Sequence, residues 1–288
     1  MNTRSWTCAV LPGLALACAS VHPGPSGPST LERIKSSKVI KLGHRDSSIP
    51  FSYVGQDGKP AGYSVDLCNR VVDGLRSDLG IPDLRAEWVK VTPETRIDAL
   101  VDGAIDLECG STTVTLGRQE RVDFSNLIFV DGASLLSRVD AGLRALGELS
   151  GKKVAVISGT TTEHVLRDAF RKAGLNVQVV TVTYTREGLL AVDQQRVAAY
   201  AADRAVLVNL ALTSPHPDHY TIIDAWLSYE PYGLMLRRDP DFRLAVNRQL
   251  ARIYRSGAIL ELYRTWFGNL GPPGSLLGAI YELYSLPE

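Results

Sequence analysis

The residues Asp106-Leu-Glu-Cys-Gly-Ser-Thr-Thr-Val-Thr-Leu-Gly-Arg118-Gln-Glu-Arg121 combine a predicted strand with a cluster of polar side chains. The strand, residues 105–109, leads into Gly110, which allows the backbone to turn tightly. Three hydroxyl residues follow, numbers 111–113, and Arg118 offers a planar fork of donors suited to a carboxylate. This pattern predicts either a pocket for a small anion or an ordinary turn whose hydroxyls cap the helix that carries Arg118.

Length and composition limit the kinds of partner that the protein can have. A chain of 288 residues is long enough for two lobes, and 45% hydrophobic with 22% charged residues is typical of a globular protein. Lys plus Arg and Asp plus Glu are balanced at 31 each, without long runs of one charge. We therefore expect no nucleic-acid partner, and any functional positive charge must be local.

The amino terminus predicts export. A basic start is followed by an apolar stretch that ends in Ala15-Leu16-Ala17, an A-x-A cleavage pattern, so residues 1–17 are interpreted as an export signal peptide. The stretch is too short for a spanning helix, which needs about 20 apolar residues. Residues 18–30 are rich in Pro, Gly and Ser and are predicted to be a flexible tether. The folded part is therefore expected in the periplasm.

The four cysteines raise two questions. Cys18 directly follows Ala17, and this junction resembles the lipobox of bacterial lipoproteins, although Ala15 and Leu16 stand in the reverse of the usual order. Lipidation of Cys18 and ordinary soluble export both stay open. An oxidising compartment permits Cys68 and Cys109 to pair, but both lie in apolar surroundings, so we favour two separate buried thiols.

The chain shows no metal or cofactor motif. It contains no CxxC pair, its five histidines are scattered, and it lacks a nucleophile elbow, a P-loop and a dinucleotide fingerprint. We therefore expect no metal site and no cofactor.

Strands and helices alternate along the chain, which predicts an α/β fold with parallel or mixed sheets. Ser64 and Thr92 are expected to cap helices. The principal strands are predicted at 39–43, 84–91, 105–109, 154–157, 177–182 and 197–202, and the principal helices at 31–36, 65–75, 163–172, 186–194, 205–212 and 240–267.

The glycine–hydroxyl turn occurs a second time. The predicted strand 154–157 ends in Ser158-Gly159-Thr160-Thr161, directly before a helix, whose free N–H groups can bind an anion. Asp203 follows another predicted strand and is either a helix cap or a partner for an ammonium group. Arg118 and the hydroxyls could bind the carboxylate of an α-amino acid, and Asp203 could bind its ammonium group.

Four segments carry a resemblance to a known family. They are Gly43-His-Arg-Asp-Ser-Ser-Ile-Pro-Phe-Ser-Tyr53, Glu108-Cys-Gly-Ser-Thr-Thr113, Ser158-Gly-Thr-Thr161 and Tyr232-Gly-Leu-Met-Leu-Arg237. With them the chain resembles the bacterial extracellular solute-binding proteins of family 3, the polar amino-acid receptors of ABC importers. It is most similar to the glutamate/aspartate-binding proteins, over roughly residues 30–271.

The resemblance implies a two-lobed periplasmic-binding-protein fold. Each lobe would hold a mostly parallel sheet flanked by helices, and a hinge of two segments, near 129–134 and 229–232, would join the lobes. The implied boundaries are 31–131 plus 234–288 for lobe 1 and 132–233 for lobe 2. Such a protein captures its ligand by hinge closure and delivers it to an ABC permease in the inner membrane; a monomer is expected.

The resemblance also implies roles for individual residues. Arg118 would bind the ligand α-carboxylate and Asp203 the α-ammonium, while Arg45 and Arg96 would bind a side-chain carboxylate. The predicted ligand-binding residues are therefore Arg45, Arg96, Ser111, Thr113, Arg118, Thr160 and Asp203, and the implied ligand is glutamate or aspartate.

The sequence departs from the family pattern at three positions. Pro93 and Ile157 stand where the family carries hydroxyl residues, and Thr185 stands near the place of a histidine. An alternative from the same fold is a secreted dehydratase of the prephenate or arogenate type, which needs a general acid or base in the cleft. Glu108 and His44 are the obvious candidates, and we expect both to be structural, so a binding protein rather than an enzyme is predicted.

Overall fold

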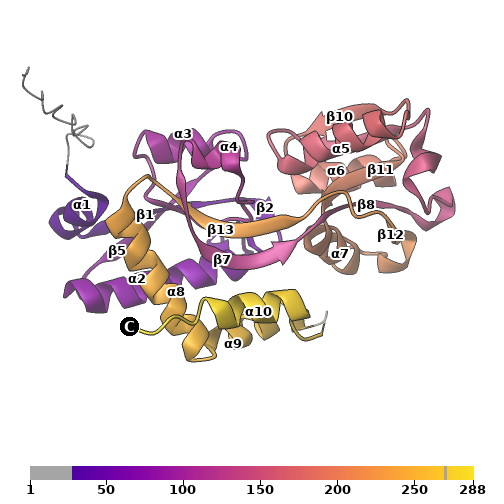
Figure 1. Cartoon of the computed structure of the whole chain (residues 1–288). Coiled ribbons are helices and arrows are strands. Elements are labelled where there is room, and N and C mark those ends of the chain that lie inside the picture. The colour runs from indigo at the N-terminus through magenta and orange to yellow at the C-terminus, as the bar shows by residue number, and fades with distance from the viewer. Residues whose placement is uncertain (1–27, 269–270) are drawn as a thin grey trace, which may run out of the picture.

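The computed structural model describes residues 28–268 and 271–288 and contains two five-stranded sheets at opposite ends of an elongated molecule (Figure 1). The sheet orders are β5-β1-β6-β13-β7 and β10-β9-β11-β8-β12. We call the half that holds the first sheet lobe 1 and the half that holds the second sheet lobe 2. The expected two-lobed α/β fold is confirmed.

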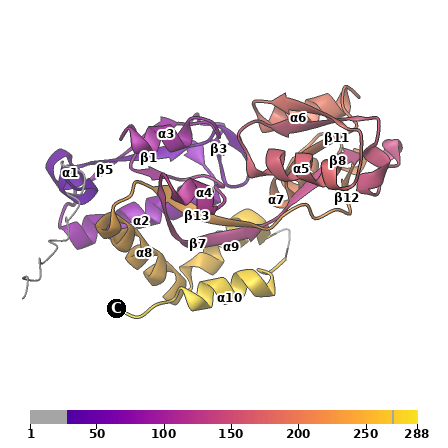
Figure 2. The same ribbon diagram turned by 45° about the horizontal axis from the view of Figure 1, so that its top comes forward.

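Lobe 1 is built from both ends of the chain. Its N-terminal part comprises α1 (Thr30–Ser37), β1 (Val39–His44), β2 (Ser47–Ser48), β3 (Ser52–Val54), β4 (Pro60–Ala61), α2 (Tyr63–Leu79), β5 (Arg85–Lys90), α3 (Arg96–Val101), β6 (Leu107–Glu108), α4 (Leu116–Gln119) and β7 (Asp123–Asp131). The chain returns through β13 (Glu230–Leu236), α8 (Pro240–Arg255), α9 (Ala258–Phe267) and α10 (Ser275–Leu283). Helices α2 and α8 to α10 cover one side of the sheet, and α3 and α4 lie on the other (Figures 1 and 2).

Lobe 2 is formed by one continuous segment of the chain, between β7 and β13. It comprises β8 (Ala133–Arg138), β9 (Lys153–Ile157), α5 (Thr161–Lys172), β10 (Gln178–Val182), α6 (Thr185–Asp193), β11 (Ala199–Asp203), α7 (Arg204–Leu212) and β12 (Tyr220–Ile223). One face of its sheet packs with α5, through Leu166 and Phe170, and the other face packs with α6 and α7.

The two sheets share one topology. In lobe 1, β5, β1 and β6 are parallel and β13 and β7 are antiparallel to their neighbours; in lobe 2, β10, β9 and β11 are parallel and β8 and β12 antiparallel. The expectation of mostly parallel sheets therefore holds for three strands of each sheet. The chain enters lobe 2 through β7 and β8 and leaves it through β12 and β13, and these four strands are the antiparallel ones.

Two long strands connect the lobes. Glu230 of β13 pairs with Asp131 of β7, and Tyr232 pairs with Phe129. Figure 1 shows both strands running side by side from lobe 1 toward lobe 2. The predicted hinge segments, 129–134 and 229–232, coincide with these crossings; their bending and the lobe boundaries stay predictions.

Cys68 and Cys109 form a disulfide, so the prediction of two separate thiols is wrong. Their Cα atoms are 6.2 Å apart although 41 positions separate them in sequence, because Cys68 lies on the buried face of α2, which packs against lobe 1's sheet beside the end of β6. A Cα separation of this size suits a disulfide. The local sequence could not reveal this packing.

The predicted helix cap at Ser64 is also wrong, and the predicted start at Thr92 is one turn early. Gly62, not Ser64, precedes α2, and Ser64 is a buried residue of the first turn whose N–H donates to the Phe51 carbonyl. Helix α3 begins at Arg96 with Thr95 as its N-cap, one turn later than predicted. The Thr92 hydroxyl nevertheless accepts from the Thr95 N–H at 3.2 Å, which is the bond of a cap, in the turn that leads into the helix.

The predicted export signal, residues 1–17, Cys18 and most of the tether lie outside the described residues. The tether prediction extends slightly too far, because Ser29 caps α1 in a capping box with Glu32 and Thr30 is already helical. In the part of the chain that the structure describes, no helix has the length and apolar character needed to cross a membrane.

Candidate functional site

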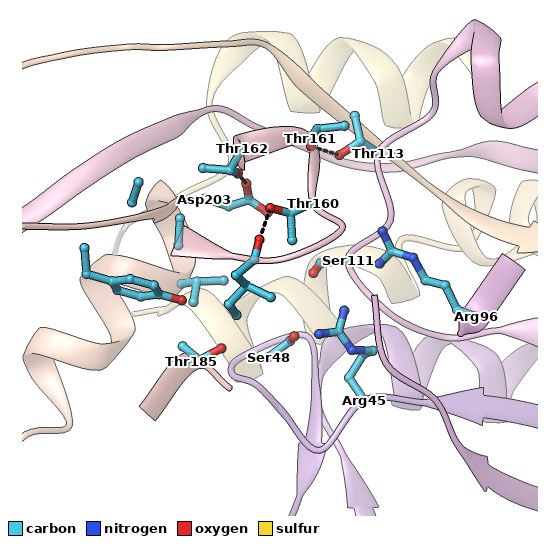
Figure 3. Close-up of a pocket in the computed structure, with 15 residues that line it drawn as sticks. Arg45, Ser48, Arg96, Ser111, Thr113, Thr160, Thr161, Thr162, Thr185 and Asp203 are labelled. Carbon is cyan, nitrogen blue, oxygen red and sulfur yellow. Dashed lines mark hydrogen bonds between the residues drawn. The ribbon is translucent and has the colours of Figure 1, made fainter. Parts of the chain in front are cut away.

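A cavity lies between the two lobes, where strands of both sheets end. Arg45 follows β1, Asp203 is the last residue of β11, and Thr160 follows β9. Ligands of open α/β sheets bind at such carboxyl ends. Six of the seven predicted residues line this cavity (Figure 3): Arg45, Arg96, Ser111, Thr113, Thr160 and Asp203.

The lobes touch each other around the cavity. The hydroxyl of Thr113 in lobe 1 lies 3.3 Å from the hydroxyl of Thr161 in lobe 2. Gly159, at φ +73°, approaches so closely that an added Cβ would lie 3.0 Å from Cγ of Glu94. The structure therefore describes a closed arrangement, in which groups from both lobes can reach one small ligand.

Arg118 supports the cavity wall instead of lining the cavity. Its Nη1 donates to the Thr113 carbonyl at 2.7 Å. Burial, together with the positive charge of Arg96, lowers the pKa of Arg118 to about 10. The helix that carries Arg118, α4, is capped by Thr115, so residues 111–113 do not serve as that cap.

Arg45 and Arg96 concentrate positive charge in the cavity. They are 4% and 3% exposed, and within the described residues their Nε atoms have no hydrogen-bond partner. Burial and the neighbouring Arg96 lower the pKa of Arg45 to about 10, and burial also lowers the pKa of Arg96. Glu108 opposes both shifts, but its Oε2 accepts from the Thr112 hydroxyl at 2.7 Å. Asp46 opposes the shift of Arg45 and Asp203 that of Arg96, but neither guanidinium forms an ion pair with a carboxylate among the described residues. Their unpartnered buried donors favour an anionic ligand.

Asp203 provides negative charge on the lobe 2 side. Its Oδ1 accepts from the Thr162 hydroxyl at 3.2 Å, and its Oδ2 accepts from the Tyr232 hydroxyl. Burial and the charge of Glu230 raise the pKa of Asp203 to about 6, and the two hydroxyls oppose that rise. Asp203 is therefore largely ionised at neutral pH and can hold an ammonium group.

Glu230 joins the lobes at the crossing. It is 1% exposed, and its Oε2 accepts from the hydroxyls of both Thr113 and Thr161, the latter at 2.8 Å. Its Oε1 accepts from the Ser228 hydroxyl at 2.5 Å. Sequence reasoning missed Glu230, because nothing around it signals that two distant threonines converge there.

Sequence reasoning also missed several cavity-lining residues. The hydroxyl turns at 111–113 and 158–162 pointed to the region, but the remaining members belong to other elements. The additional polar lining residues are Ser48, Thr161, Thr162, Thr185 and Tyr200. Thr160 lines the cavity and is also the N-cap of α5, since its hydroxyl accepts from the Glu163 N–H at 3.2 Å.

The two residues considered for acid–base chemistry lie outside the cavity lining. Glu108 is fully buried in β6 beside Thr112. Nδ1 of His44 lies 2.9 Å from the Arg45 carbonyl, and its ring packs edge-on against Trp88. Both positions agree with the structural roles expected for them.

The sequence matches that of a described family. Residues 40–269 match the bacterial extracellular solute-binding proteins, family 3. The chain belongs to this family. Among its relatives, the L-glutamate/L-aspartate-binding protein of Pseudomonas aeruginosa is 38% identical over 251 residues, which cover 86% of this chain and 82% of that protein.

Other relatives agree with this placement. The glutamate/aspartate import solute-binding protein of Salmonella typhimurium is 35% identical over 279 residues, 96% of this chain and 92% of that protein. Among solved structures, an ancestral amino acid-binding protein, described as a precursor of cyclohexadienyl dehydratase, is similar with a TM-score of 0.73 and 26% identity. That match covers 83% of this chain and 100% of the ancestral one.

Proposed function

We propose that this family member is the receptor of an amino-acid ABC importer and captures an acidic L-amino acid, glutamate or aspartate. The observation that carries the proposal is the pair of buried guanidinium groups, Arg45 and Arg96, whose Nε donors have no hydrogen-bond partner and which form no ion pair within the described residues. Buried charge without full compensation is costly. A ligand with a side-chain carboxylate would supply the missing negative charge through charge-assisted hydrogen bonds.

The α-amino and α-carboxyl groups of the ligand would occupy the opposite part of the cavity. Asp203 would hold the ammonium group, and the Ser111 hydroxyl would donate to the α-carboxylate. Thr113 and Thr160 would line this part of the cavity, with their hydroxyl protons already donated to Glu230 and to the Ile157 carbonyl. Arg118 would add positive charge from behind the wall, because its guanidinium contacts the Thr113 carbonyl. The names of the Pseudomonas and Salmonella relatives support the same ligand class.

Capture would work by closure of the two lobes. The proposed contacts divide between the lobes, with the arginines on lobe 1 and Asp203 and Thr160 on lobe 2. A ligand that bridges both sides binds the closed state better than an open one, so it shifts the population toward closure. We place the bending at the two crossings, 129–134 and 229–232, and propose that a permease in the inner membrane receives the closed complex.

The dehydratase alternative gains less support. The ancestral relative links this fold to a dehydratase lineage, but that protein is itself described as amino acid-binding. The acid in the cavity of this chain, Asp203, is engaged by Tyr232 and Thr162. A binding protein without enzymatic activity accounts better for the arrangement.

Compartment and anchoring follow from the same proposal. Family membership supports a folded part outside the cytoplasm. We propose that residues 1–17 direct export to the periplasm, with the protein working as a monomer. Mass spectrometry of the exported protein would distinguish a lipid anchor from soluble export. A diacylglyceryl adduct at Cys18 indicates the anchor, and an unmodified mature N-terminus indicates soluble export.

Isothermal titration calorimetry with L-glutamate, L-aspartate, L-glutamine and L-asparagine tests the ligand class. We expect the two acids to bind more tightly than their amides. Arg45→Met and Arg96→Met should each weaken binding of the acids by about 30-fold or more, with smaller losses for the amides. Arg85→Met, on the exposed side of β5, is the matched control. Equal affinity for acids and amides, or no binding of either, would contradict the proposal.

A further inference from the structure

Tyr200 is built into the cavity wall from lobe 2. Its ring is fully buried in β11, between Leu136 of β8 and Ala155 of β9 in the sheet. Helix α6 approaches the ring so closely that a Cβ added to Gly188 would lie 2.4 Å from ring carbon Cδ2. The ring is therefore held in one place by the sheet and by α6.

The hydroxyl of Tyr200 is the unusual part of this side chain. It is buried, it belongs to the cavity lining, and it has no hydrogen-bond partner among the described residues. A phenylalanine would fill the same apolar site without burying a polar atom. Leaving such a donor unsatisfied costs free energy, so a native hydroxyl of this kind calls for an explanation.

The surroundings of the hydroxyl identify the part of the cavity that it serves. Burial and the charge of Asp203 raise the pKa of Tyr200, while the Thr185 hydroxyl and the Arg45 guanidinium oppose that rise. The phenol therefore keeps its proton and can donate. The Thr185 hydroxyl is a near neighbour of the phenol but does not form a hydrogen bond with it. Figure 3 shows Thr185, Ser48 and Arg45 along one side of the cavity, away from Thr162 and Asp203. Tyr200 thus faces the end assigned above to the ligand side chain.

We propose that Tyr200 is a specificity-determining residue whose hydroxyl donates a hydrogen bond to the side-chain carboxylate of the bound amino acid, next to Arg45. This inference rests on the proposed function. It adds a contact from lobe 2 to a group otherwise held by lobe 1 alone. Recognition of the side chain is then coupled to closure, because the carboxylate is fully bonded only when the lobes meet.

The variant Tyr200→Phe tests this inference, since it keeps the ring against Gly188 and removes one oxygen. Calorimetry on the purified protein should show a loss of about 10- to 100-fold in affinity for L-glutamate or L-aspartate. The loss for L-glutamine should be smaller, because a bond to a neutral group is weaker. Tyr220→Phe is the control: it makes the same change in lobe 2, where the hydroxyl donates to Asp193 and lies outside this cavity lining.

A second readout separates binding from folding. The thermal midpoint of ligand-free Tyr200→Phe should equal or exceed that of the parent, because the hydroxyl has no partner within the described residues. A clear fall in that midpoint would overturn the inference, since the hydroxyl would then stabilise the protein itself. Unchanged affinity, or equal losses for acids and amides, would also overturn it.

The outcomes distinguish this inference from the proposed function. If the parent protein binds acidic amino acids and Tyr200→Phe binds them equally well, only the role of Tyr200 fails. If the parent binds no acidic amino acid, the proposed function fails and the role of Tyr200 fails with it.

Discussion

Reduction of the Cys68–Cys109 disulfide should lower the free energy of unfolding by about 4 kcal/mol at 25 °C. The magnitude follows from the sequence separation of 41 residues, which sets the size of the loop that the bond closes in the unfolded chain. Both cysteines are fully buried, so their sulfur atoms keep their packing partners after reduction. The expected loss therefore comes chiefly from the greater freedom of the unfolded chain.

Urea titrations followed by circular dichroism, with and without dithiothreitol, measure this difference. Each titration passes through the unfolded state, in which the reductant can reach the buried bond. The double variant Cys68→Ala/Cys109→Ala is the control, and its stability should not respond to dithiothreitol. It also reveals any effect of the reductant on Cys8 and Cys18. A difference below about 1 kcal/mol between oxidised and reduced parent protein would refute the assigned loop-closure contribution.

Two further predictions concern ligand binding. Affinity for an acidic amino acid should fall, by up to roughly tenfold per pH unit, as the pH drops below about 6. The raised pKa of Asp203 means that its carboxylate is ionised above this range and loses its charge below it. Asp203→Asn should bind weakly without that dependence, and a flat parent profile between pH 7 and 5 would contradict the assignment. Glu230→Ala should reduce affinity about tenfold, because Thr113 and Thr161 lose their shared acceptor and closure becomes less favourable. Small-angle scattering should show a more open ligand-free molecule, and unchanged affinity and shape would exclude this role.

The main elements of the fold were predictable because their signals are local. The apolar spacing at positions 65, 68, 71, 72 and 75 places one face of α2 in the core, and all five residues are buried. The glycine–hydroxyl turns after β6 and β9 likewise mark the ends of strands that meet at the cavity. The hydrogen bonds and backbone freedom that produce these signals lie within a few residues.

The precise starts of helices were less predictable. Ser64 has the right chemistry for a cap but lies inside α2, and Thr92 makes a capping bond one turn before the residue at which α3 begins. The Ser64 N–H is taken by the Phe51 carbonyl, and Thr92 bonds within its own turn. A cap therefore depends on which neighbours the chain brings to it, as well as on its own side chain.

By itself the sequence determined the order of strands and helices, the two hydroxyl turns and six of the side chains that line the cavity, since each depends on local patterning or on a motif. Tertiary structure alone decided which distant residues meet. Packing of α2 on the sheet brings Cys68 to Cys109, and the pairing of β7 with β13 carries Glu230 to both lobes. Residues 106–121 therefore contribute one wall of the cavity, with Arg118 behind it, and only the packing of the two lobes completes the site.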